Sequence, residues 1–328
     1  MLMKELPKIP DDAMMRKLEP PTGNISMVLD TDTYNEVDDQ FAVVHAMLSD
    51  KLDVEAIYAA PFHNNRSTGP GDGMEKSYEE ILRLLDLMEH KHTDFVFRGS
   101  RSYLPAPGKP VESEAVEHLI QRAMADRDGL LYVAAIGAIT NVVSAIMIQP
   151  EIIDRILVVW LGGQPHYWPR ANDFNLGQDL TASKFLFDCG VPLVHMPCTH
   201  VSEYLRTTVP EMERYVKGCG SLGEYLYETF ASYWHEHENQ RAVRAGSSAA
   251  HADHFAWSKV IWDISAIAWL VNPNWVPTNV CHTPILTTEV TWSHRPSRHF
   301  MRVGTRVNRD AVFGDLFRKL EKHSSSGK

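Results

Sequence analysis

The chain has 328 residues, 44% of them hydrophobic, and a formal net charge of −10. This length and apolar content allow a large core, and we expect a single α/β domain. The acidic balance and the lack of a long Lys/Arg run argue against nucleic acid or an anionic membrane as partner, so we expect a small-molecule ligand. No apolar stretch approaches the ~20 residues that a bilayer span needs.

The ends of the chain and its cysteines favour a cytoplasmic protein. Residues 1–24 mix acidic, basic and proline residues without the apolar core of a secretory signal, and we interpret them as an N-terminal extension. We expect the α/β domain to span residues 25–320 and a flexible tail to follow at 321–328. The cysteines show no CxxC spacing, which favours free buried thiols in a reducing compartment; they are Cys189, Cys198, Cys219 and Cys281.

Strand-like apolar runs alternate with helical patterns between residues 25 and 197. The runs predicted as strands are 25–30, 54–59, 95–98, 130–136, 156–161 and 191–197. The segments with helical spacing between them are 76–89, 113–126, 141–148 and 180–189. This alternation is typical of right-handed βαβ units and predicts a doubly wound, mostly parallel central sheet flanked by helices.

The pattern changes after residue 197. Residues 212–236 and 258–270 are predicted to be helical, and 285–303 is predicted to be strand-like. The Gly-rich segment 67–73 has Glu75 where a phosphate-binding loop needs a glycine before its lysine, so we expect a mobile loop near the sheet edge instead.

Five carboxylates lie within ten residues between the first predicted strand and the next helical run: Asp30, Asp32, Glu36, Asp38 and Asp39. A strand that turns directly into a helix places such side chains at the carboxyl edge of the sheet, where open α/β proteins bind ligands. Carboxylates this close require protons or a cation when they are partly desolvated. Because the cluster holds only oxygen ligands, it favours calcium or magnesium.

Two common interpretations of this cluster fit poorly. An EF-hand counted from Asp30 would place Tyr34 and Phe41 at positions that require oxygen ligands. The strand end also resembles that of phosphatases of the haloacid-dehalogenase type, with Asp30 as nucleophile and Asp32 as acid/base. That family needs a later acidic pair, which is not evident here. The phosphatase is therefore the second choice and stays an alternative.

The same run, 30–39, resembles the N-terminal signature of the nucleoside hydrolases, which are calcium-dependent enzymes that cleave the N-glycosidic bond between ribose and a nucleobase. Further segments resemble the same family in the same order: 134–141, 161–163, 173–175 and 262–263. The resemblance implies the fold predicted above, a hydrolase acting on N-glycosyl compounds and a homo-oligomer, either a dimer or a tetramer.

The resemblance also implies a ligand set for Ca²⁺. It assigns the ion to Asp32, Asp39, the backbone carbonyl of Ile136 and Asp263, with Asp32 accepting a proton from the attacking water. The chain departs from the family pattern in several places: two extra residues lie between Asp32 and Asp38, Asp173 stands where the family has Glu, the Asn usual before it has no clear match, and Trp262 stands where many members have His.

The substrate contacts follow from the same resemblance. Asp38 is expected to bind ribose hydroxyls, and Trp262 is expected to stack on the leaving base, as in the purine-preferring branch. The remaining residues expected around the substrate are Asn35, Glu36, His63, Asp173, Asn175, Trp168, Tyr233 and Trp234.

Each assignment has a structural alternative. Asp263 could cap a helix, Asp173 and Asn175 could form a turn, and Trp262 could be a core aromatic residue. A sugar-binding or nucleoside-binding protein without turnover is the functional alternative that the sequence leaves open.

Overall fold

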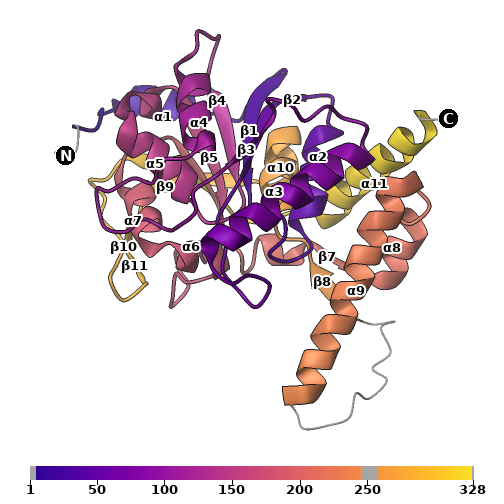
Figure 1. The fold of residues 1–328 in the computed structure, drawn as a ribbon. Helices are drawn as coiled ribbons and strands as arrows, with labels where there is room; N and C mark the ends of the chain where they lie inside the picture. The colour runs from indigo at the N-terminus through magenta and orange to yellow at the C-terminus, as the bar shows by residue number, and fades with distance from the viewer. Residues whose placement is uncertain (1–4, 245–256, 327–328) are drawn as a thin grey trace.

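The computed structural model describes residues 5–244 and 257–326, and the side chains of 237–244 and of Ser326 are outside this description. Its centre is a sheet of eight strands (Figure 1). The strands are β1 (Ile25–Thr31), β2 (Leu52–Ala59), β3 (Val96–Arg98), β4 (Leu131–Ala135), β5 (Ile156–Leu161), β6 (Leu193–Met196), β9 (Thr278–His282) and β12 (Phe300–Gly304).

The strand order is β3-β2-β1-β4-β5-β6-β12-β9, and β9 is antiparallel to β12 while the other neighbouring pairs are parallel. The chain passes from β1 to β2 and β3 on one side and then returns to β4 on the other side of β1. The order therefore reverses between β1 and β4, and ligands of open α/β sheets bind outside the carboxyl ends of the strands at such a point. The predicted fold class, a mostly parallel sheet flanked by helices in one domain, is confirmed.

Helices cover both faces of the sheet, and the alternation of side chains along β1 shows why. Leu29 belongs to one buried apolar cluster and Val28 to the other, because successive strand residues point to opposite faces. The first cluster includes α2 (Asp39–Met47), α3 (Pro70–Leu87), α8 (Val209–Tyr215), α9 (Gly220–Arg244), α10 (Ile264–Val271) and α11 (Arg309–Ser326). The second includes α4 (Glu114–Met124), α5 (Thr140–Ile148) and α7 (Leu180–Asp188).

Short elements complete the structure. They are the helices α1 (Asp11–Lys17) and α6 (Phe174–Gln178), the paired strands β7 (Arg206–Thr208) with β8 (Ser258–Val260), the paired strands β10 (Ile285–Leu286) with β11 (Trp292–Ser293), and the 3-10 turns Pro150–Asp154, Ser202–Tyr204 and Pro273–Trp275. None of the helices in the described part of the chain has the length and apolar character that a bilayer crossing requires.

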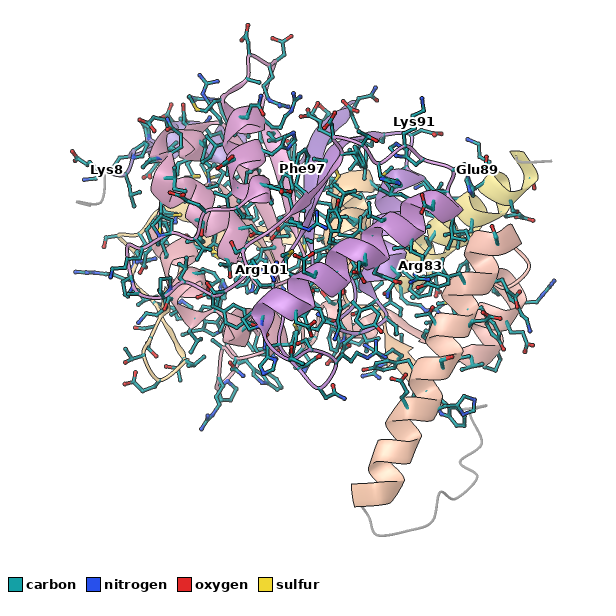
Figure 2. The ribbon with its side chains drawn as sticks, viewed as in Figure 1. Lys8, Arg83, Glu89, Lys91, Phe97 and Arg101 are labelled. Carbon is teal, nitrogen blue, oxygen red and sulfur yellow. The ribbon has the colours of Figure 1, made fainter. Side chains whose placement is uncertain are left out.

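Side chains pack between the sheet and its helices, and some of them also cover the outer edge of the sheet at β3, where Phe97 lies (Figure 2). The ring of Phe97 in β3 stacks on His118 of α4, with 3.9 Å between centroids and 19° between planes. Arg98 lies over the ring of Tyr78 in α3 at 3.8 Å. These contacts from both helix layers cover an edge that would otherwise be open to another strand.

The segment 67–73 differs from its prediction, because α3 begins at Pro70 within it. Proline suits the first turn of a helix, since its fixed φ is helical and its missing N–H has no partner there in any case. Gly73 is required next, because a Cβ at this position would lie 2.0 Å from the carbonyl oxygen of Phe62. The glycines thus allow close packing of a helix and do not make a mobile loop.

Three later predictions are also corrected. Segment 212–236 holds two helices, α8 and α9, separated by the turn at residues 216–219, and α9 begins at Gly220, whose φ of +69° favours glycine. Segment 258–270 begins with β8, and α10 starts only after Asp263. Segment 285–303 contains three separate strands, and β9, which the sequence did not predict, completes the edge of the sheet beside β12.

Both ends of the chain contribute to the fold. In the N-terminal extension, Met14 and Leu18 are buried, and the guanidinium of Arg302 in β12 donates to the Leu18 carbonyl. At the other end, α11 includes residues 321–326, where the sequence suggested a tail. All four cysteines are free, and Cys281 is only partly buried.

If α1 belongs to the folded core, Leu18→Ala should lower the free energy of unfolding by about 2–5 kcal/mol, because it leaves a cavity at a fully buried site. Met15→Ala is the matched control, since the Met15 side chain on the same helix is exposed and its loss should cost under about 0.5 kcal/mol. Urea unfolding followed by circular dichroism measures both. Equal effects would show that the extension is not part of the cooperative unit.

Candidate metal and substrate site

Four aspartates from three places in the chain meet at the carboxyl edge of the sheet. Asp32 follows β1, Asp38 and Asp39 open α2, and Asp263 directly precedes α10; each is at most 4% exposed. Asp38, Asp39 and Asp263 each offer an oxygen within 4.8 Å of the others. Asp32 lies beside this group, close enough for the charge of Asp39 to raise its pKa.

The electrostatics of the group favour a cation. Burial raises the pKa of Asp32, Asp39 and Asp263 far above the ordinary range, and the charges of the neighbouring aspartates raise these pKa values further. Among the described residues, Lys259 supplies positive charge at one side of the group, with its Nζ 4.0 Å from Asp38 Oδ2. The cluster therefore carries more negative charge than the neighbouring protein compensates.

Unpartnered atoms test whether a metal ion fits here. Asp32 Oδ1 and Asp39 Oδ2 are buried and accept no hydrogen bond from the described residues, whereas a buried polar atom normally has a partner. The other oxygen of Asp39 accepts a hydrogen bond from the Thr31 hydroxyl at 2.5 Å. The donor set consists of carboxylate oxygens, which hard divalent cations prefer. The residues present fit a metal ion of this class.

The end of β4 meets the cluster from the adjacent strand. The amide of Ile136 donates to the Asp30 carbonyl at 2.8 Å, which fixes the β4 end against β1. A Cβ at Gly137 would lie 2.9 Å from Cγ of Asp32, so only glycine allows this approach. The Ile136 carbonyl accepts from Asn175 Nδ2 at 2.8 Å and retains a second lone pair.

A cavity of about 260 Å³ opens beside the aspartates. Trp262 lies in its wall, and its backbone N–H donates to Asp38 Oδ2 at 3.2 Å. The cavity thus has charged oxygens at one end and an aromatic ring nearby. Its lining consists of Asn35, Glu36, Asp38, Ile136, Leu161, Gln164, Asp173, Phe174, Asn175, Cys198, Thr199, Trp262 and Asp263.

Asp173 and Asn175 line the cavity but also have structural partners. Asp173 Oδ1 accepts from the amides of Gly163 and Leu176 at 2.6 and 2.9 Å and caps α6, while the Cys198 thiol donates to Oδ2 at 3.1 Å. Asn175 Nδ2 bridges the Ile136 carbonyl and the Leu161 carbonyl, which end β4 and β5. The turn-forming alternative therefore accounts for much of Asp173, and Asn175 connects two strand ends.

The two residues of the unusual spacing, Asn35 and Glu36, both face the cavity. Asn35 Nδ2 donates to Asp32 Oδ2 at 2.6 Å. Glu36 Oε2 is 2.5 Å from the Lys259 ammonium, an ion pair that joins this turn to β8.

The other predicted contacts are more scattered. Tyr233 and Glu36 line a second cavity of about 220 Å³ together with Asn64 and Arg66. His63 is exposed and bonds to Gln178 through its amide, and it lines neither of these two cavities. Trp168 packs against His200, and Trp234 is largely buried beside His235, also away from both linings.

Sequence reasoning missed several residues of the site. Lys259 is the most consequential, because it neutralises part of the charge around Asp38. The sequence did contain one signal, since buried carboxylates require positive charge nearby. It could not show which basic side chain supplies that charge, because Lys259 is 221 residues from Asp38 along the chain. The others are Gln164, Phe174, Cys198, Thr199, Asn64, Asn65, Arg66 and Glu236.

Asp30 is placed unsuitably for the phosphatase alternative. It is fully buried, its Oδ1 accepts from Asn141 Nδ2 at 2.7 Å, and it does not line the cavity. Burial also raises its pKa to about 7. A nucleophile has to reach its substrate from the cavity, and Asp30 instead fastens β1 to the start of α5.

The chain matches a family model described as inosine-uridine preferring nucleoside hydrolase over residues 27–314. Among its relatives, the probable uridine nucleosidase 2 of Arabidopsis thaliana is 23% identical over 235 residues, which cover 64% of this chain and 70% of that protein. The pyrimidine-specific ribonucleoside hydrolase RihB of Escherichia coli O157:H7 is 24% identical over 213 residues, which cover 63% of this chain and 62% of RihB.

Solved structures support the fold. A purine-preferring ribonucleoside hydrolase from Gardnerella vaginalis is similar with a TM-score of 0.68 and 19% identity, covering 92% of this chain and 99% of that one. The effector protein XOO4466 is similar with a TM-score of 0.64 and 13% identity, covering 96% and 98%.

The charge cluster predicts how stability depends on pH in the metal-free protein. The folded-state pKa of Asp39 is raised to about 8 from an ordinary value of 3.8. Its contribution to stability is therefore complete below about pH 4 and is lost as the pH rises toward 8. Asp39→Asn removes this penalty, so the variant should exceed the wild type in free energy of unfolding by ~1 kcal/mol or more at pH 8, and by less at pH 5.

Chelator-treated wild type and Asp39→Asn should be unfolded by urea at both pH values. The comparison isolates the cluster, because the buried histidines titrate in both proteins. A difference in stability that stays constant or shrinks from pH 5 to pH 8 would contradict the raised pKa.

Proposed function

We propose that this chain, which belongs to the nucleoside hydrolase family, hydrolyses the N-glycosidic bond of a nucleoside with a calcium ion held at the carboxyl edge of its sheet. The proposal is supported most by one observation at the β1/β4 switch point: Asp38 and Asp263 line a cavity of about 260 Å³, and the neighbouring Asp32 and Asp39 each have a buried oxygen without a hydrogen-bond partner among the described residues. A binding cavity needs such charge only if a cation or developing positive charge is present.

Asp32, Asp39, Asp263 and the carbonyl of Ile136 would hold the ion. Calcium suits this set better than zinc, because the set offers oxygens from flexible carboxylates and a backbone carbonyl without His or Cys. A bound divalent ion lowers the pKa of water and orients it.

The protein's own groups would carry the reaction. Asp32 Oδ1, which has no hydrogen-bond partner among the described residues, accepts a proton from water as the water oxygen forms a bond to the anomeric carbon. The bond to the base nitrogen breaks, and the base leaves with the electron pair and takes a proton from solvent. The carboxylates around the sugar stabilise the positive charge that develops on its ring.

Asp38 would bind ribose hydroxyls. The Trp262 amide and the Lys259 ammonium lie at its Oδ2, so its carboxylate is oriented by groups of β8 and of the segment between β8 and α10. Trp262 and Phe174 offer aromatic faces in the same cavity for the base to stack on. Asp173 and Asn175 would contact the sugar from α6.

The names of related proteins include both pyrimidine-specific and purine-preferring enzymes, so a test of the proposal needs nucleosides of both kinds. We also expect a dimer or tetramer and a cytoplasmic location, and gel filtration with light scattering would measure the first. A protein that binds a nucleoside without turnover is the alternative.

A panel of purine and pyrimidine nucleosides tests the proposal, with released base and reducing sugar measured before and after treatment with a calcium chelator. We expect release that the chelator abolishes and added calcium restores. Binding of nucleosides without release of base would favour the non-catalytic alternative.

Asp32→Asn should lower kcat by about 10²- to 10⁴-fold, because the amide cannot accept the proton from water. Asp53→Asn is the matched control, since Asp53 is an exposed aspartate on neighbouring strand β2 and should retain wild-type turnover. A hydrolysis assay at saturating nucleoside measures both variants. Undiminished turnover by Asp32→Asn would rule out the assigned role of Asp32.

A further inference from the structure

The turn between β1 and α2 places an amide directly against Asp32. Asn35 Nδ2 donates to Asp32 Oδ2 at 2.6 Å, and the Asn35 residue is only 6% exposed. The amide oxygen of Asn35 is itself buried without a hydrogen-bond partner among the described residues. Burying an amide oxygen without a partner costs free energy. Because the amide nitrogen of the same side chain donates to Asp32, the proposed general base, we infer a role beyond shaping the turn.

The turn is fixed by groups outside it. The backbone N–H of Asn35 donates to the Asp32 carbonyl at 2.8 Å. From the loop after β2, Asn64 Nδ2 donates to the Asn35 carbonyl at 3.0 Å, and Arg66 Nη1 donates to the Glu36 carbonyl at 3.2 Å. Because its backbone is held on two sides, Asn35 offers its N–H₂ group to Asp32 from a fixed position.

This contact distinguishes the two oxygens of Asp32. Asn35 occupies Oδ2, while Oδ1 has no partner among the described residues. On the other side of the carboxylate, Gly137 is so close that a Cβ there would lie 2.9 Å from both Cγ and Oδ1. The carboxylate is therefore confined between an amide donor and the end of β4, and rotation that exchanged its oxygens would lose the hydrogen bond.

We propose that Asn35 is a positioning residue of this hydrolase, which holds Asp32 through Oδ2 and so presents Oδ1 to the metal ion and to the attacking water. This inference rests on the proposed function. It also explains the extra length of the turn, because the additional residues bring an amide donor to Asp32, the proposed general base.

Two variants separate the hydrogen bond from the volume of the side chain. Asn35→Leu keeps nearly the same size but cannot donate, and Asn35→Ala removes both donor and volume. Asn24→Leu is the matched control, because Asn24 is an exposed asparagine at the opposite end of β1, just before the strand begins. Thermal unfolding establishes that each variant is folded, and Asn35→Ala serves if the leucine is not accommodated.

Calcium binding by titration calorimetry and steady-state hydrolysis of inosine and uridine are the readouts. We expect both Asn35 variants to lose about ten- to hundredfold in kcat, as for a lost hydrogen bond to a charged group, with KM changed by less than about threefold. Their calcium affinity should fall about tenfold, and Asn24→Leu should match the wild type in all three quantities.

Wild-type kcat and calcium affinity in Asn35→Leu would overturn the inference, as would an increase in KM alone, which would make Asn35 a substrate contact. If the wild type binds calcium but hydrolyses neither nucleoside, the hydrolase proposal fails for these substrates, and the calcium affinity of Asn35→Leu alone decides the positioning role. A wild type that binds no calcium contradicts both proposals.

Discussion

The structure depends on the burial of aspartates at the point where β1 and β4 diverge. Burial raises the pKa of Asp32, Asp39 and Asp263, and the charge of neighbouring Asp38 raises each of these pKa values further, which makes the metal-free arrangement costly. The fold tolerates this cost because the surrounding sheet is extensively buried on both faces. A cation would convert the mutual repulsion into attraction, so the same residues that weaken the metal-free protein would bind the ion tightly.

Hydrogen bonds from neighbouring groups hold these carboxylates and the adjoining strand ends in place. Asn175 ties the ends of β4 and β5, Thr31 and Asn35 each hold one oxygen of an aspartate, and the amide of Trp262 reaches Asp38. Among the described residues, the contacts of Thr31 and Asn35 leave Asp39 Oδ2 and Asp32 Oδ1 without a hydrogen-bond partner, and Asp38 lines the cavity. Precise orientation of this kind matters because small displacements of reacting groups reduce rates strongly.

Much of the fold and family could be predicted from sequence, because the evidence for both is local. Alternating strands and helices gave the parallel sheet, and the acidic run after β1, with motifs in the right order, gave the family and the enzyme class, which are confirmed. Contacts between distant segments could not be predicted: Lys259 meets Glu36 only through the β7 and β8 pair, and β9 joins the sheet through β12. The start of α3 was missed because glycine composition does not reveal close packing against Phe62. The roles of individual site residues stay predictions.

Anomalous diffraction from crystals grown with calcium would test the central claim most directly. We predict one strong peak per chain, with Asp39, Asp263, Asp32 Oδ1 and the Ile136 carbonyl as ligands at 2.3–2.6 Å, roughly the range for calcium. The peak should be missing in Asp39→Asn crystals grown in the same way. Crystals saturated with calcium that show no peak between these residues, or a peak elsewhere that survives the substitution, would contradict the account.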